Sequence, residues 1–118
     1  MSHHFSDLHN LLPHQLTIPP LGEKGTLTIY NLRSGIMAKH SEGMTYRIME
    51  EDWAFARMLR GAFPDAPWQS ALYTELNVYF RCSLAYAAAL LRHMEHVEAT
   101  KQRSRSRARL QRKSQPHE

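Results

Sequence analysis

The sequence has a single cysteine, Cys82, and only five glycines among its 118 residues. One cysteine excludes an intramolecular disulfide framework and a cysteine-rich zinc site. Cys82 lies in an apolar stretch, where we expect a small buried hydrophobic residue. The glycines form no phosphate loop, because Gly22 and Gly25 precede a predicted strand and not a helix.

Long apolar runs are also missing. The longest, Cys82 to Leu91, has ten residues and is interrupted by Ser83, whereas a membrane-spanning helix needs about 20. The N-terminus shows no charged-then-apolar signal layout. We therefore expect a soluble, cytoplasmic protein with no membrane partner.

Catalytic motifs are absent as well: there is no nucleophile elbow, zincin or paired-carboxylate pattern. Glu50, Glu51 and Asp52 are consecutive, so on a helix they point in different directions and indicate a solvated face. His93 and His96 are spaced to share a helix face, but they would supply only half of a zinc site. We expect no enzymatic activity, no cofactor and no metal site.

The basic residues are concentrated at the end of the chain. Residues 1–98 contain eight Lys or Arg and ten Asp or Glu, a net charge of −2, whereas residues 99–118 contain seven Lys or Arg and one Glu, a net charge of +6. Binding to a polyanion is therefore expected only in this final segment. The seven predicted nucleic-acid-binding residues are Lys101, Arg103, Arg105, Arg107, Arg109, Arg112 and Lys113.

Two β-strands are predicted near the N-terminus. Gln15–Ile18 and Thr26–Leu32 are rich in Thr, Ile, Leu and Tyr, and a Pro-Gly-rich loop separates them, which indicates a hairpin. A hairpin alone is marginally stable and must pack on a helix or a second copy. Residues 37–43 read as a polar connection to the next element.

Two helices are predicted after the hairpin. Met49, Trp53, Ala56 and Leu59 recur at steps of three or four, which predicts a helix over about 45–61. An N-cap at Asp65 and Pro67 in the first turn predict a second, long helix over about 66–100. A short turn between the helices predicts a core made by both. Its expected members are Trp53, Phe63, Trp68, Leu72, Leu76 and Tyr79.

The long helix is apolar on almost every side, so it needs neighbours on more than one side. At about 1.5 Å per residue it would span about 50 Å, too long for one small domain to cover. It must break, project, or pack against a second copy or partner helix. The predicted oligomer or partner interface comprises Tyr79, Leu84, Tyr86, Ala87, Leu90, Leu91 and Met94.

The predicted fold is therefore α+β and helix-dominated, with an N-terminal β-hairpin packed on two helices. Residues 1–14 are expected to be a flexible His-rich segment, 15–100 a single small domain, and 101–118 a disordered basic tail. A helical tail is the alternative, because Lys101, Arg105, Arg109 and Lys113 recur every four residues.

Two functions fit this pattern. The first is a small non-enzymatic accessory or regulatory protein that binds DNA or RNA through the basic tail of an oligomeric helical body. The second is an adapter that binds another protein through the apolar long helix and the hairpin edge, with a merely solubilising tail.

Overall fold

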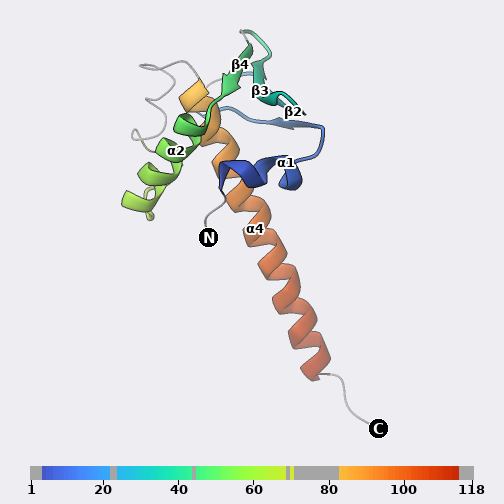
Figure 1. The fold of residues 1–118 in the computed structure, drawn as a ribbon. Coiled ribbons are helices and arrows are strands. Elements are labelled where there is room, and N and C mark those ends of the chain that lie inside the picture. The colour runs from blue at the N-terminus through green and yellow to red at the C-terminus, as the bar shows by residue number, and fades with distance from the viewer. Residues whose placement is uncertain (1–3, 22–23, 44, 69, 71–82, 115–118) are drawn as a thin grey trace.

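The computed structural model describes residues 4–21, 24–43, 45–68, 70 and 83–114, with the backbone alone at 83 and over 105–114. The chain has an α+β fold (Figure 1). Its elements in chain order are η1 (Phe5–Asp7), α1 (Leu8–Leu11), β1 (Gln15–Ile18), β2 (Leu27–Leu32), β3 (Gly35–His40), β4 (Thr45–Ile48), α2 (Glu50–Ala62) and α4 (Ser83–Ser114).

The predicted hairpin is confirmed, but it is half of a larger sheet. β1 and β2 pair antiparallel, with Gln15 opposite Tyr30 and Ile18 opposite Leu27. β3 and β4 extend this pairing into a four-stranded antiparallel sheet in the order β1-β2-β3-β4. Each strand is therefore joined to the next by a hairpin connection.

The prediction of a polar connection over 37–43 is wrong, because Gly35–His40 is strand β3. Ile36, Ala38 and His40 are buried, whereas Met37 and Lys39 between them are more accessible. This is the two-residue alternation of a strand with one face in the core. Polar His40 on the inner side, and weak strand formers such as Ala38, disguise that alternation in the sequence.

The prediction of a helix from residue 45 is wrong at its start, where Thr45–Ile48 forms strand β4. Thr45, Tyr46 and Ile48 are β-branched or aromatic residues, which favour strands, and β4 pairs with β3. Helix α2 then begins at Glu50, where the Asp52 carboxylate accepts a hydrogen bond of 3.1 Å from the Met49 N–H. This bond satisfies one donor that the first helical turn leaves unpaired.

The long helix begins and ends later in the chain than the predicted range of about 66–100. Residues 65–68 and 70 are not helical, so the predicted start at Asp65 is wrong. Pro64 and Pro67 explain this, since proline disfavours the helical conformation of the residue before it. Residues 71–82 lie outside the described residues, and so do the predicted core residues Leu72, Leu76 and Tyr79.

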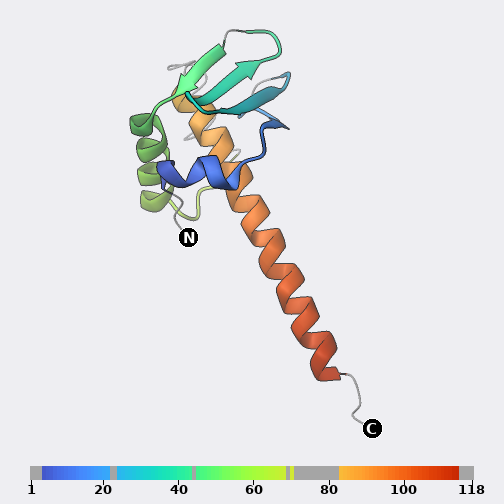
Figure 2. The same cartoon turned by 45° about the vertical axis from the view of Figure 1, so that its right-hand side comes forward.

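Helix α4 runs from Ser83 to Ser114 and includes most of the basic segment. The backbone of residues 101–114 is part of this helix, and the disorder predicted for residues 101–118 is not confirmed. The first part of α4 lies against the inner face of the sheet, and the last part projects from the body (Figures 1 and 2). The molecule is therefore elongated, with principal extents of 61 × 33 × 25 Å.

The core lies between the inner face of the sheet, α4, α2 and the N-terminal helices. Trp53 is buried, as predicted, but Phe63 is 51% exposed, and its predicted core position is wrong. Trp68 is partly buried against the core. Helices α2 and α4 do pack together, but the described part of α4 begins well beyond the short turn that was expected to join them.

The N-terminal segment, expected to be flexible, is docked in the described residues 4–14. Leu8 and Leu12 are buried in the core. Asn31 of β2 donates from its amide nitrogen to the carbonyl oxygens of His9 and Leu12, at 2.9 and 3.0 Å. These bonds pair two carbonyl groups at the end of α1 that the helix itself leaves free.

Candidate nucleic-acid interface

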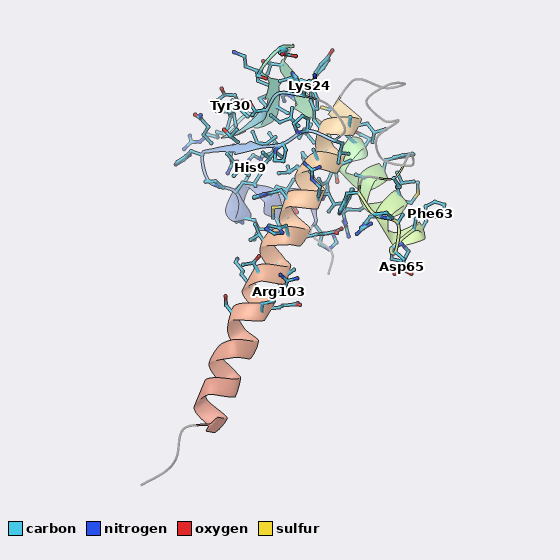
Figure 3. All side chains as sticks on the ribbon, turned by 180° about the vertical axis from the view of Figure 1, so that it is seen from behind. His9, Lys24, Tyr30, Phe63, Asp65 and Arg103 are labelled. Atoms are coloured by element: carbon cyan, nitrogen blue, oxygen red, sulfur yellow. The ribbon has the colours of Figure 1, made fainter. Side chains whose placement is uncertain are left out.

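The basic segment of α4 is continuous with the centre of the core. Ala87, Ala89 and Leu90 of α4 are fully buried, and their small or apolar side chains let the sheet and α2 approach closely. Exposure rises along the helix, and residues 99–104 are all exposed. The same helix therefore anchors the body and presents its basic end to solvent (Figure 3).

The seven predicted nucleic-acid-binding residues all lie on this projecting part of α4. Lys101 and Arg103 are exposed, and the structure describes the backbone positions of Arg105, Arg107, Arg109, Arg112 and Lys113 within the helix. At about 100° per residue, positions 101, 105, 109, 112 and 113 fall within an arc of about 120°. Positions 103 and 107 fall on another side of the helix.

No carboxylate lies among these cations, since residues 99–114 contain no Asp or Glu. The last acidic residues before them are Glu95 and Glu98, at the point where α4 leaves the body. The projecting part of α4 therefore has one sign of charge over 14 residues, or about 21 Å at 1.5 Å per residue.

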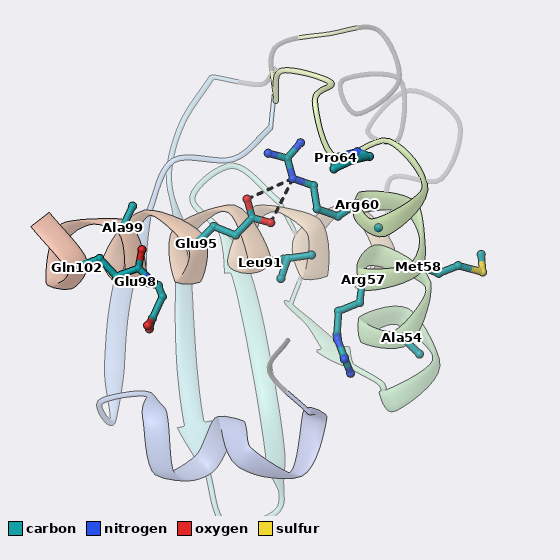
Figure 4. A pocket seen from close by; sticks show the side chains of 11 residues that line it. Ala54, Arg57, Met58, Arg60, Pro64, Leu91, Glu95, Glu98, Ala99 and Gln102 are labelled. Carbon is teal, nitrogen blue, oxygen red and sulfur yellow. Dashed lines mark hydrogen bonds and ion pairs between the residues drawn. The ribbon is translucent and has the colours of Figure 1, made fainter. Parts of the chain in front are cut away.

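An open groove with a volume of about 860 Å³ lies beside the base of the projecting helix (Figure 4). Helix α2 and the turn after it form one wall, and α4 forms the other. The lining residues are Ala54, Arg57, Met58, Arg60, Gly61, Pro64, Leu91, Glu95, Glu98, Ala99 and Gln102.

Arg60 holds the walls of this groove together. Its Nε donates to both carboxylate oxygens of Glu95, at 3.2 Å each (Figure 4). Its guanidinium carbon lies 4.4 Å from the centre of the Trp68 ring, and Nη1 donates to the Ala66 carbonyl. Arg60 thus joins α2, the turn after it and α4 in one cluster, at the point where α4 leaves the body.

Two further residues of α4 contribute to its electrostatics. The pKa of His93 is lowered from its usual range, first because burial disfavours the charged imidazolium, and further because of electrostatic interactions with His96 and Arg92. Arg92 donates from Nη2 to the Pro19 carbonyl after β1. This bond ties the side of α4 to the sheet.

The described residues of the predicted oligomer or partner interface form part of the core of the chain. Leu84, Tyr86, Ala87, Leu90, Leu91 and Met94 are all buried within the chain, and Tyr79 lies outside the described residues. The Tyr86 ring lies 5.7 Å from that of Tyr46 on β4. The sheet and α2 supply the neighbours that the apolar helix needs, so the structure does not support a second copy or partner helix on this face.

The structure adds two negative observations about the described residues. They contain no group of three or more His, Cys, Asp or Glu arranged to hold a metal ion. None of the helices in these ranges combines the length and apolarity that a membrane crossing demands.

Sequence reasoning missed the groove. Arg60 and Glu95 are 35 residues apart, on helices whose mutual position depends on the whole sheet. Met58, which lines the groove, is 61% exposed, but exposure of a large apolar residue can be recognised only in the folded chain.

In comparisons with known proteins, no protein-family model, curated protein or solved structure matches the chain.

Proposed function

We propose that the protein is a small non-enzymatic accessory or regulatory protein of the cytoplasm that binds the phosphate backbone of DNA or RNA. The binding element is the projecting part of α4, with Lys101, Arg103, Arg105, Arg107, Arg109, Arg112 and Lys113. The observation behind this proposal is that one continuous helix begins in the core and ends with seven basic residues and no acidic one.

The chemistry of the segment supports this proposal. Nucleic-acid phosphates bind Lys and Arg with release of condensed counterions, and this release supplies much of the non-specific affinity. A helix is about 10–12 Å across, which fits the major groove of B-DNA, about 12 Å wide. Cations on two sides of the helix suit phosphates on the two flanks of such a groove.

The anchoring of α4 supports the proposal as well. A free tail loses conformational entropy when a ligand orders it, and this loss weakens binding. A helix that begins in the core has its first turns already formed, so fewer residues become ordered on binding. Phosphate contacts of this kind position a protein on nucleic acid and discriminate little between base sequences.

Two matched double variants of the full-length chain test the proposal. One replaces Arg103 and Arg105 by Gln on α4, and the other replaces Lys24 and Arg33 by Gln near the sheet. Both remove two positive charges. We expect the α4 variant alone to lose most of its affinity for a labelled duplex of random sequence. Equal affinities for the two variants would contradict the proposal.

A second candidate function is partner binding in the groove between α2 and α4. The exposed Met58 side chain lines this groove, and Phe55 lies exposed nearby on the same helix, which is the kind of surface that marks a protein interaction site. Replacing Met58 by Glu would abolish such an interaction and leave duplex binding by α4 unchanged. The apolar face of α4 itself is covered, so the adapter hypothesis now depends on this groove.

A further inference from the structure

The sheet has a second face that no described helix covers. α1, α2 and α4 all lie on the inner side of the sheet (Figures 1 and 2), where Ile18, Leu27, Ile29, Ile36 and Ile48 are buried. Successive side chains of a strand point to opposite faces, so the residues between these form the outer face.

Strand register arranges the outer face in two rows. One row runs across all four strands through Gln15, Tyr30, Met37 and Arg47, and the next through Thr17, Thr28, Lys39 and Thr45. None of the four strands contains an Asp or Glu. The outer face therefore presents an aromatic ring, hydroxyl groups and two cations, without a carboxylate.

Tyr30 lies on a central strand of this face and is half-buried. Figure 3 shows it on the side of the body opposite Phe63. Met37 is its direct cross-strand neighbour, and Leu32, two residues along β2, is 44% exposed. Lys39 is a diagonal neighbour of Tyr30, at about 7–8 Å between backbones.

Arg47 is held in place on the same face. Its Nη1 donates to the Ser34 carbonyl at 3.0 Å. A Cβ added to Gly35 would lie 3.4 to 3.7 Å from Nη1, Cζ and Nε of Arg47. The guanidinium therefore packs over Gly35, on the side where another residue would carry its side chain. Gly35 also has a φ of +149°, which side chains rarely adopt. A charged group fixed in this way loses little freedom when it binds an anion.

We propose that this outer face, defined by Tyr30, Met37, Lys39, Arg47, Thr28 and Thr17, binds single-stranded RNA. A splayed base stacks on the Tyr30 ring, and Lys39 and Arg47 hold the phosphates on either side. The hydroxyls of Thr28, which is paired with Lys39, and of Thr17, which is paired with Thr28, donate to and accept from ribose 2′-hydroxyl groups, which DNA lacks. A paired base in a duplex cannot reach a flat sheet in this way, so unpaired strands are the expected ligand.

This proposal is independent of the basic helix, because the outer face contains no residue of α4. The two sites also differ in their ligands, since α4 has only charge to offer and the sheet adds a stacking surface. A full-length chain in which the seven basic residues of the projecting part of α4 are replaced by Gln, with Arg92 left in place, therefore separates the two sites.

The experiment measures binding of a labelled ten-nucleotide oligouridylate to this neutralised chain and to the original chain. Tyr30→Leu keeps an apolar side chain and removes the ring, whereas Tyr30→Phe keeps the ring. In the neutralised chain we expect Tyr30→Leu to weaken binding by roughly 5- to 150-fold and Tyr30→Phe to change it little. Equal binding by the Leu and Phe variants would overturn the proposal, and the function of α4 would be unaffected by that result.

Two further measurements test the anion contacts and the choice of RNA. Arg47→Gln should reduce the slope of log K against log salt by about 0.7, the value for one single-strand phosphate contact, and an unchanged slope would count against this contact. A deoxythymidine oligomer should bind more weakly than oligouridylate, and equal or tighter binding would refute the assignment to RNA. Circular dichroism and urea unfolding confirm that each variant is folded.

Discussion

Arg60 of α2 donates through Nε to both carboxylate oxygens of Glu95 on α4 at 3.2 Å. The two side chains are 21% and 34% exposed, so solvent screens the pair only in part. The Trp68 ring against the guanidinium adds a cation–π contact. This cluster lies where the last buried turn of α4 gives way to the projecting part.

The first prediction concerns Arg60. Replacing it by Ala should lower the free energy of unfolding by about 1–2 kcal/mol, because an ion pair, a cation–π contact and a bond to the Ala66 carbonyl are lost together. Urea unfolding measures the change. Arg57→Ala, one turn away on the same helix, is the matched control and should cost less than about 0.5 kcal/mol. Similar losses for both variants would show that the cluster is not stabilising.

The second prediction concerns the core. Trp53 is 1% exposed, so Trp53→Ala should lower the free energy of unfolding by about 3–5 kcal/mol through lost burial and a cavity. Phe63→Ala is the control, since its exposed ring leaves no cavity and should cost less than about 1 kcal/mol. A larger loss at Phe63 than at Trp53 would contradict the observed packing of α2.

The third prediction concerns salt. If about five basic residues of α4 contact duplex phosphates, log K should fall by about 4.5 for each tenfold rise in salt. Replacing Arg109 by Ala should reduce this slope by about 0.9, whereas replacing Arg33 by Ala should leave it unchanged. Fluorescence anisotropy with a labelled duplex at several salt concentrations measures both slopes. A slope near zero would rule out phosphate binding.

The fourth prediction distinguishes the effect of the helical conformation of α4 on duplex binding from the effect of its positive charges. Ala108→Pro costs a helix interior about 3 kcal/mol and leaves every basic residue in place. We expect it to lower the helix content seen by circular dichroism and to weaken duplex binding, because positions 109, 112 and 113 leave their shared face. Ala108→Ser is the control. Unchanged affinity of the proline variant would mean that the segment binds as a flexible chain.

The fifth prediction concerns pH. Because the pKa of His93 is lower in the folded protein than in the unfolded chain, the unfolded chain binds more protons below about pH 6.5. The stability that depends on a neutral His93 is therefore fully present above pH 6.5. It is lost as the pH falls through the lowered pKa of His93. His93→Gln should flatten that decline in urea unfolding, and His96→Gln should flatten it less. If the free energy of unfolding of the His93→Gln variant falls with pH as steeply as that of the original chain, His93 is not the cause of the decline.

Elements with a local sequence pattern could be predicted, whereas those that depend on distant residues could not. Leu84 to Leu91 is apolar on all sides of a helix, and the expectation of several neighbours was correct. The identity of those neighbours could not be inferred, because the residues of β3 and β4 resemble a polar connection and the start of a helix. A two-stranded hairpin is too small to cover the apolar helix. A second copy of the chain was therefore expected to cover the part that β3 and β4 cover in the structure.

The candidate sites show the same limit. The seven basic residues were found from composition alone, because charge needs no tertiary context. The outer face of the sheet could not be found, since Tyr30, Met37 and Arg47 become neighbours only through the register of three strands. The groove was missed for a similar reason, as Arg60 meets Glu95 only when α2 and α4 are packed.

The continuity of α4 gives one helix two very different stabilities. Amide protons near Ala87 and Leu90, in the buried part, should exchange with solvent only when the whole domain unfolds, whereas those beyond residue 101 need only local fraying. Phosphate binding would slow exchange in the outer turns first. Hydrogen exchange along a single helix would then report both the folding of the core and the occupancy of the basic end.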